Sequence, residues 1–378
     1  MLQITPQIQV DQYYESDALS QSTLKNLIKG LDYFLEKQEK KDDEESDFFV
    51  IGSAVDCILT GNDEDFGNKF YISNMENSPS EAEMEIVNLV FQNSEESRPT
   101  LKQYPEEILQ ACLQTGWQKN YKDQTKIDKI IEKGSLYFEE LRRSQGKIVI
   151  TKTQDNLINA IVTSLRESET TKKFFDRELY SKLEHYTMFL QYPIYFKINN
   201  IDCKALLDML ICEVEDEILV LYPIDIKTTR FSTIDFPNAV RTYRYDLQAA
   251  WYTEALWSIK DRLLKEFNCK HLIINNFQFI VESTAKQGKP MVYQVTSELL
   301  KIGKFGQEEI SANKMGIHSL DVNVNTNRRI ISPAIKGFDQ LLKEYTFYME
   351  NGWDKDYRLR NQKENLPVSI DWKGILEE

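Results

Sequence analysis

The chain is poor in the residues that build disulfide frameworks and the common transition-metal sites. Its five cysteines are Cys57, Cys112, Cys203, Cys212 and Cys269. They include no C-x-x-C pair, so neither a zinc site nor an iron–sulfur cluster is predicted, and buried or free thiols are the simpler interpretation. The three histidines, His185, His271 and His318, show no metal-binding spacing. We expect them to be structural or surface residues.

Long apolar runs are also missing. No stretch approaches the roughly 18 apolar residues that a membrane-spanning helix needs. Residues 1–6 lack the basic segment followed by an apolar one that marks a secretory signal. These features predict a soluble cytoplasmic protein without a membrane partner.

Positive charge is scarce relative to negative charge. The chain has 46 Lys and Arg against 60 Asp and Glu, which gives a formal net charge of −14. A negative charge of this size argues against non-specific coating of nucleic acid. It is compatible with a local basic channel, so any DNA-binding surface must be concentrated in one place.

What the chain does contain is enough apolar residues for a core, in an α+β pattern. Hydrophobic residues make up 41% of the 378 residues, and this length suits one elaborated domain or two. We predict a central mixed sheet of about five strands, flanked by helices, with a large helical insertion before the core strands. The expected parts are core helices at 15–60, the insertion at 61–180, the sheet and its following helix at 181–300, and helices and a tail at 301–378.

The strands are predicted in the second half of the chain. Residues 185–190, 194–198, 201–214 and 218–227 are rich in Ile, Leu, Tyr, Phe and Val. Pro193 and two short polar segments separate them, so three or four sequential, antiparallel strands are expected. Further strands are predicted at 271–281 and 291–295, and helices at 19–28, 48–59, 236–262, 298–302 and 335–350.

An acid and a lysine stand two residues apart at the end of an apolar segment that runs from Leu219 to Thr229. On a strand, Asp225 and Lys227 would project from the same face. Opposite charges beside an apolar run are costly unless they are paired, exposed in a cleft or bound to a metal. An ion pair without further function is the ordinary explanation, and a D-x-K pattern alone is a weak signal.

A hairpin is predicted to bring a second acid to this point. Asp208 and Asp225 are equally distant from the turn at residues 215–217. If the turn is tight, the two acids lie opposite one another on neighbouring strands. Two unpaired carboxylates would repel, and a divalent cation between them would remove the conflict. Hard oxygen ligands suit Mg²⁺ or Mn²⁺ rather than zinc.

The helix predicted after these strands carries a second group of polar residues. Gln248 and Tyr252 are four residues apart and share one helical face. A polar pair on a half-exposed face is the ordinary interpretation. A local cluster of positive charge is expected near the acids, from Lys227, Arg230, Arg241 and Arg244.

Together these residues resemble the PD-(D/E)XK nuclease superfamily, most closely its RecB-like branch and the phage exonuclease VIII (RecE-like) group. Asp208 matches the first acidic motif, and Asp225 to Lys227, within Pro223-Ile-Asp-Ile-Lys-Thr-Thr, match the D/E-x-K motif. Gln248 to Tyr252 match the Q-x-x-x-Y motif of the RecB-like branch. Segments 19–24, 278–282 and 290–293 also resemble the family. The resemblance is clear over residues 180–300 and implies a single domain, 1–378, with a restriction-endonuclease-like α/β core.

One position departs from the family pattern. The early helix of this branch commonly reads Gly-x-x-x-His, whereas this chain has Gly52-Ser-Ala-Val-Asp56. An aspartate oxygen could still ligate Mg²⁺ or Mn²⁺, directly or through water. Alternatively, the site is altered and its activity is weakened or lost. Glu184 stands where the family often has another acid, either as a further metal ligand or as an exposed glutamate at a strand start.

The resemblance implies metal-dependent hydrolysis of phosphodiesters. Mg²⁺ or Mn²⁺ would be held by Asp208, Asp225 and the Ile226 carbonyl, and no nucleotide cofactor is expected. The metal would lower the pKa of a bound water and stabilise charge in the transition state. Lys227 would orient or help deprotonate that water, or stabilise the developing charge.

The resemblance also assigns roles to the residues around this centre. Gln248 and Tyr252 would position the phosphate or the strand end. The expected contacts to the DNA backbone come from Arg230, Arg241, Arg244 and Tyr245.

The leading hypothesis is an exonuclease that processes duplex DNA ends, of the phage or prophage recombination type. One alternative is a catalytically reduced nuclease fold that binds DNA ends or proteins, and another is an endonuclease of the same fold. Exonucleases of this group often form rings, so the resemblance makes a homo-oligomer and a single-strand annealing partner plausible.

Overall fold

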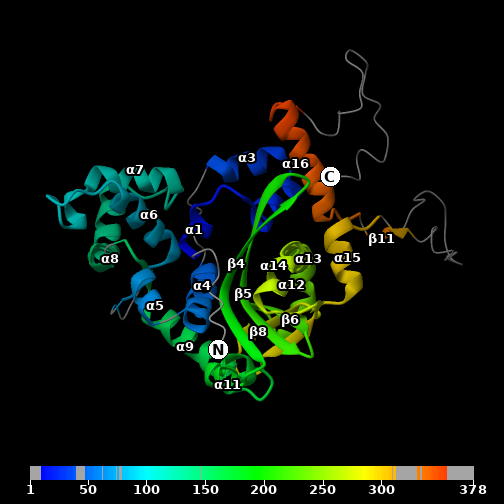
Figure 1. The fold of residues 1–378 in the computed structure, drawn as a ribbon. Coiled ribbons are helices and arrows are strands. Elements are labelled where there is room, and N and C mark those ends of the chain that lie inside the picture. Colours follow the sequence, from blue (N-terminus) through cyan, green and yellow to red (C-terminus); the bar gives the residue numbers. More distant parts are fainter. Residues whose placement is uncertain are drawn as a thin grey trace, which may run out of the picture. The chain divides into compact units, whose positions relative to one another are not determined.

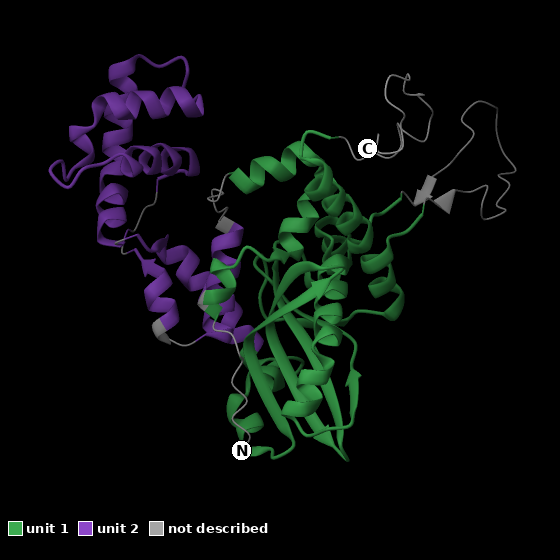
Figure 2. Ribbon diagram, turned by 45° about the horizontal axis from the view of Figure 1, so that its top comes forward, with its two compact units in different colours: residues 1–44, 166–378 green, residues 45–165 purple. Residues whose placement is uncertain are grey.

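A computed structural model describes most of the chain, and its residues fall into two compact units. The first comprises Met1–Glu44 and Arg166–Glu378, and the second Glu45–Leu165 (Figure 2). Residues 356–378, which include most of the predicted tail, lie outside the described part. The described residues are 10–39, 47–61, 63–73, 75, 79–144, 146–308, 310–311, 330–332 and 334–355.

The first unit is built on a seven-stranded mixed sheet (Figure 1). Strands β4 (Tyr186–Ile198), β5 (Ile201–Glu215) and β6 (Ile218–Thr229) follow one another in antiparallel pairs. The other edge of β6 pairs in parallel with β7 (His271–Ile274) and then β8 (Gln278–Ser283). The sheet is completed by β9 (Met291–Gln294), antiparallel to β8, and by β1 (Leu19–Ser20), parallel to β5. The predicted α+β class with a central mixed sheet is confirmed.

The two prolines of these strands sit where the sheet tolerates a missing N–H. Pro193 was expected to end a strand, but β4 runs through it. Within the described residues β4 pairs only with β5, and an edge strand can carry a proline because one side of it needs no ladder bonds. Pro223 lies where the partner of β6 changes, since the pairing with β7 ends at Leu221 and that with β8 begins at Ile224.

The helix predicted over 236–262 is three helices. These are α12 (Phe236–Tyr243), α13 (Tyr245–Ser258) and α14 (Lys260–Glu266). The first break is at Arg244, whose φ of 57° and ψ of 48° place it in the left-handed region. A non-glycine residue rarely adopts this conformation, so the break has no clear signature in the sequence.

The remaining helices of the first unit include those predicted near residues 19–28, 298–302 and 335–350. Ser20 caps α2 (Gln21–Lys25), the helix predicted at 19–28, and accepts a hydrogen bond from Thr23 N, as expected for a serine at this position. These helices are α1 (Val10–Glu15), α2 (Gln21–Lys25), η1 (Asn26–Lys29), α3 (Leu31–Glu39), α10 (Lys172–Phe175), α11 (Arg177–Lys182), η3 (Thr233–Asp235), α15 (Ser297–Phe305) and α16 (Phe338–Asn351). A short pair, β10 (Ile310–Ser311) with β11 (Ile330–Ser332), lies between the last two.

The core of the first unit fixes α13 against the sheet. Trp251 of α13 is fully buried, with Phe196 of β4 and Phe338 of α16 each 5.4 Å from its ring. Its indole N–H donates to the Lys204 carbonyl of β5 at 3.0 Å. Gly303 of α15 allows close approach from the other side, because a Cβ there would lie 2.1 Å from the Asp246 carbonyl oxygen. The position of α13 is therefore set by contacts on two sides.

The second unit is mainly helical and has a core of its own around Val87, Tyr104 and Phe138. It begins earlier than the predicted insertion, because the helix expected at 48–59 belongs to it. A short parallel strand pair was not predicted. Its elements are α4 (Asp47–Thr60), α5 (Asp63–Lys69), β2 (Phe70–Ile72), α6 (Glu81–Gln92), η2 (Leu101–Gln103), α7 (Pro105–Thr115), α8 (Asp123–Ser144), β3 (Ile148–Ile150) and α9 (Lys152–Glu167).

In the part of the chain that the structure describes, no helix has the length and apolar character needed to cross a membrane.

Candidate active site at the end of strand β6

The β5–β6 hairpin places the two predicted acids on neighbouring strands. Asp216 and Glu217 form the turn, and both have positive φ values, 47° and 64°, as a two-residue hairpin turn requires. The regular pairing of the two strands ends with Met209 opposite Ile224, so Asp208 and Asp225 occupy the next position along it. Across this position the Asp208 carboxylate accepts a hydrogen bond from Ile226 N at 2.8 Å. The hairpin thus fixes Asp208 beside the D-x-K segment.

Asp225 lies at the centre of the site. Its side chain is 2% exposed, and that of Lys227 is 17% exposed. The Lys227 ammonium forms an ion pair with Asp225 Oδ2. Burial alone would lower the pKa of Lys227, but the carboxylates of Asp225 and Asp208 raise it above its usual value. Lys227 is therefore a charged ammonium at neutral pH.

Helix α13 brings the predicted Gln248 and Tyr252 to the same point. Gln248 Nε2 donates to Asp225 Oδ1 at 2.8 Å and lies 3.3 Å from the Tyr252 hydroxyl. Burial, and then the charge of Asp225, raise the pKa of Tyr252 well above its usual value. Its phenol is neutral at physiological pH and can donate a hydrogen bond. Four residues from strand β6 and helix α13 thus converge with Asp208 of β5.

The predicted DNA contacts are only partly free to meet a ligand. Arg230 and Arg241 are exposed, and Tyr245 presents its ring to Lys227, whose ammonium is 5.1 Å from the ring centre. Arg244 instead binds the Asp246 carboxylate with two hydrogen bonds of 2.9 Å and donates to the Lys336 carbonyl at 2.8 Å. These contacts give Arg244 a clear structural role at the start of α13.

Glu184 does not join the acids, which corrects its proposed place among the metal ligands. It is exposed, in the turn before β4. The next residue, His185, accepts a hydrogen bond from Val214 N at 2.8 Å. Val214 is separated from Asp208 by roughly 20 Å of strand β5, at about 3.3 Å per residue. The alternative interpretation, an exposed glutamate at a strand start, agrees with the structure.

Asp56 lies on α4 in the second unit and is half-buried. Thr60 Oγ1 donates to the Asp56 carbonyl at 2.7 Å and is 3.4 Å from its Oδ1. Its assignment as a metal ligand remains a prediction.

Sequence reasoning missed one cation at this site, Lys25. It follows the segment 19–24 directly and lies on α2, where its ammonium donates to the Tyr243 carbonyl at 3.2 Å. Burial lowers the pKa of Lys25, and the nearby charges of Lys227, Lys29 and Arg244 lower it further. The capped helix start was the available signal, but only the fold shows that Lys25 and Lys227 are neighbours.

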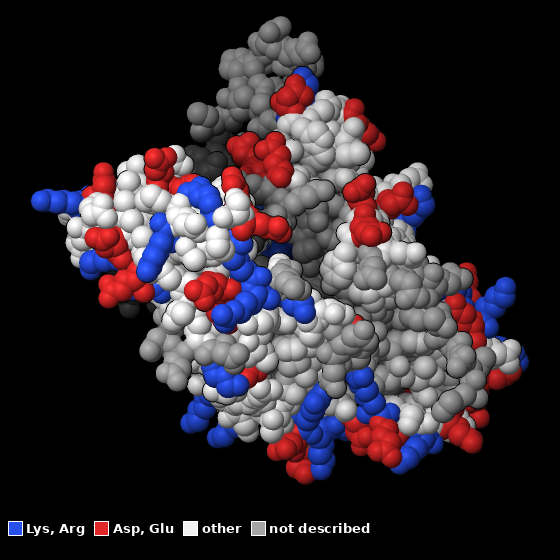
Figure 3. All heavy atoms as spheres, turned by 90° about the vertical axis from the view of Figure 1, so that its left-hand side faces the viewer, with Lys and Arg blue, Asp and Glu red and all other residues white. Residues whose placement is uncertain are grey.

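Surface charge gives little further guidance. On the face drawn in Figure 3, lysines and arginines are interspersed with aspartates and glutamates among the coloured residues. With a net charge of −14, contact with nucleic acid would depend on local groups such as Lys25, Lys227 and Arg230.

Comparison with known proteins adds little to this geometry. No family model matches the chain, and no curated protein matches it. Among solved structures, the chain is similar to one from Eubacterium rectale that is named "Putative exonuclease". The match has a TM-score of 0.40 and 13% sequence identity, and covers 99% of this chain and 98% of the other. A likeness this distant carries no argument, so functional assignment rests on the side chains.

Proposed function

We propose that the protein is a metal-dependent DNA nuclease of the PD-(D/E)XK type, RecB-like branch, and that it acts as an exonuclease on duplex ends. One observation carries the proposal. The buried Asp225 carboxylate contacts Lys227 through one oxygen and Gln248 through the other, while Asp208 is held at the next strand by Ile226 N. The ordered motif residues, far apart in the sequence, therefore gather around one carboxylate, which Lys227 and Gln248 contact directly.

An ion pair alone would not require this arrangement. A buried pair of charges contributes little net stability, because desolvation offsets its attraction. The charges of Asp225 and Lys227 would also be paired without a second acid at Asp208. The convergence of Gln248, Tyr252 and Asp208 on a costly buried pair favours a site with a chemical function.

The residues present fit a hard divalent cation. Among the described residues no group of three or more His, Cys, Asp or Glu side chains is gathered as a metal site. Mg²⁺ usually keeps several waters and is bound by only one or two carboxylates. Asp208 and Asp225 meet that need, and the Ile226 carbonyl would add a third oxygen. When bound, the ion would supply an activated water and stabilise charge on the phosphate.

The protonation states of Lys227 and Tyr252 limit the roles that these side chains can have in catalysis. Because Lys227 is held as an ammonium by two carboxylates, it would donate hydrogen bonds to the water or to the phosphate oxygens rather than remove a proton. Gln248 and the neutral Tyr252 would hold Asp225 in place and orient the phosphate. Arg230, Arg241 and the ring of Tyr245 would contact the DNA.

The proposal predicts a difference between linear and circular DNA. With Mg²⁺ the protein should degrade a linearised plasmid to small products and leave the covalently closed plasmid intact, because an exonuclease needs an end. Agarose gels and acid-soluble nucleotide release measure this, with EDTA as the control. Cleavage of the closed circle would favour an endonuclease. DNA binding without cleavage in either Mg²⁺ or Mn²⁺ would favour a catalytically reduced module.

Lys25 provides a second test, because we infer that its ammonium contacts a DNA phosphate. Lys25→Met should reduce the slope of log K against log salt by about 0.9, as expected for one lost phosphate contact. The melting temperature should be unchanged or higher, because a half-buried cation is removed from other cations. Binding is measured in EDTA to prevent cleavage.

The matched control is Lys29→Met, which removes the same charge from an exposed position one turn away on η1. Lys29 donates to Tyr33 on α3, outside the motif residues. An equal change in the slope for both variants, or no change for Lys25→Met, would show that Lys25 makes no specific phosphate contact.

A further inference from the structure

We propose that the face of the sheet opposite to Asp225 carries a second site, which binds a nucleoside monophosphate. A cavity of about 560 Å³ lies there, within the usual range for small-molecule sites. Tyr222 lines it from β6, and alternation along the strand directs Tyr222 and Asp225 to opposite faces. No lining residue belongs to the predicted catalytic set, so the inference is independent of the proposed nuclease chemistry.

One wall of the cavity is a set of aromatic rings held in fixed positions. The hydroxyls of Tyr186 and Tyr222 both donate to the Glu213 carboxylate, that of Tyr222 at 2.6 Å. The bond to Glu213 raises the pKa of Tyr186 to about 12, so the donor stays protonated. Tyr180 packs against Tyr186 with ring centres 6.0 Å apart, and Phe174 is buried beside the cavity. Rigid rings of this kind suit a flat heterocycle.

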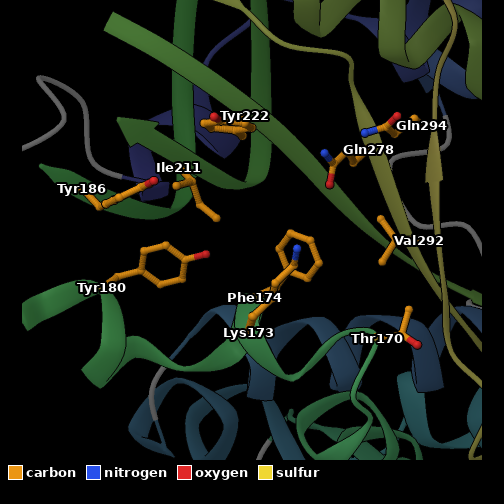
Figure 4. Close-up of a pocket in the computed structure, with 10 residues that line it drawn as sticks. All are labelled: Thr170, Lys173, Phe174, Tyr180, Tyr186, Ile211, Tyr222, Gln278, Val292 and Gln294. Atoms are coloured by element: carbon orange, nitrogen blue, oxygen red, sulfur yellow. The ribbon is translucent and has the colours of Figure 1, made fainter. Parts of the chain in front are cut away.

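The opposite wall presents two amides. Gln278 of β8 and Gln294 of β9 are direct partners in the antiparallel register, so their side chains share a face. Gln278 Oε1 is shielded from solvent and accepts no hydrogen bond from any residue that the structure describes. A buried acceptor of this kind normally has a donor, which an amino group or ring N–H of a nucleobase would supply. Figure 4 shows the amides on one side of the cavity and Tyr180 and Tyr186 on the other.

A positive charge lies between these walls. Lys173 of α10 is exposed, and its ammonium is 5.0 Å from the centre of the Phe174 ring. The neighbouring Lys172 is paired with Glu169, but Lys173 forms no ion pair with a residue in the described part of the chain. Because Glu213 carries negative charge at the aromatic wall, a ligand phosphate would lie at Lys173. The aromatic rings would thus bind the base, Gln278 its hydrogen-bonding edge, and Lys173 the phosphate.

This site departs from the sequence-based expectation that the protein uses no nucleotide. Its lining comes from α10, α11 and five strands, and their residues follow no recognisable motif. The shared ligand chemistry, a base with a phosphate, is found both in a free mononucleotide and at the end of a DNA strand. Free mononucleotide is the occupant that the volume of about 560 Å³ favours, because this is the size of a small-molecule site.

Isothermal titration calorimetry with the full chain tests the proposal. The probes are dAMP, dGMP, dCMP and dTMP, their deoxynucleosides, inorganic phosphate and a short single-stranded oligodeoxynucleotide. At least one mononucleotide should bind saturably. Gln278→Leu should weaken this binding roughly 10-fold, because it removes the amide at nearly constant size. Lys173→Ala should weaken binding of the mononucleotide and leave that of the deoxynucleoside unchanged.

Gln124→Leu is the matched control, since it makes the same change at an exposed position of α8. The oligonucleotide can also compete with the mononucleotide. If this competition is lost in Gln278→Leu, the base in the cavity comes from the end of a DNA strand. The proposal is overturned if no mononucleotide binds saturably at millimolar concentration. It is equally overturned if phosphate alone binds as well as the mononucleotide, or if both lining variants bind like the unmodified protein.

Discussion

Lys227→Ala should lower the Mg²⁺-dependent degradation of linear duplex DNA by about 10²–10³-fold, the usual loss when one charge-stabilising donor is removed. Lys227 is charged, is paired with Asp225 and lies on the same strand face. Its loss should therefore act on kcat more than on KM, because the charge that it stabilises develops during the reaction. Initial rates on a linear plasmid, measured over a range of DNA concentrations, separate the two constants.

The substitution also has a structural cost that the sequence alone did not predict. Removing one partner of a buried pair leaves the other charge uncompensated, at a cost of about 3–5 kcal/mol. We therefore expect a drop in the melting temperature of Lys227→Ala. Loss of activity in this variant could then reflect unfolding, so a second variant is needed.

The double variant Asp225→Asn with Lys227→Met separates chemistry from folding. It removes both charges at similar size, and replacement of a buried pair in this way is often neutral or stabilising. It should melt close to the unmodified protein and have no detectable activity. Lys197→Ala, which removes an exposed lysine of β4 that pairs with Asp202, is the control. A folded double variant with undiminished activity would rule out this centre as the catalytic site.

The sequence predicts this centre well where local geometry is sufficient. A two-residue turn fixes the register of a hairpin, so the positions of Asp208 and Asp225 relative to that turn were enough to place them opposite one another. The spacing of Gln248 and Tyr252 likewise follows from helical periodicity. Their meeting with Asp225 depended on the packing of α13, which only the resemblance suggested.

The sequence fails where tertiary contacts decide the conformation. Arg244 breaks the predicted helix because its side chain binds Asp246 and Lys336, which holds a left-handed backbone that arginine rarely adopts. Pro193 does not end β4 because that strand lies at a sheet edge. The position of Lys25 next to Lys227, and the cavity on the opposite face, involve segments far apart in the chain. Neither has a local pattern that periodicity or motif spacing could reveal.

Asp208 separates the metal-binding role of the site from its structural role. Its carboxylate accepts the Ile226 N–H, and the side-chain oxygen of asparagine can accept the same bond. Asp208→Asn should therefore fold normally, with a melting temperature within about 1–2 °C of the unmodified protein, since a retained hydrogen bond leaves little change in stability. It loses the negative charge that a cation would need, and that also helps to hold Lys227 as an ammonium.

Asp208→Asn should reduce nuclease activity by about 10²-fold or more, and partial activity should return at high Mn²⁺ concentration, because metal affinity depends on the number of charged ligands. The measurement is the rate on linear DNA over a series of Mg²⁺ and Mn²⁺ concentrations, together with Mn²⁺ binding followed by electron paramagnetic resonance. Asp202→Asn, an exposed acid on the same strand β5, is the matched control and should leave both unchanged. If Asp208→Asn and Asp202→Asn bind Mn²⁺ equally well, the two-carboxylate metal site is wrong, and the buried Asp225–Lys227 pair has a structural role alone.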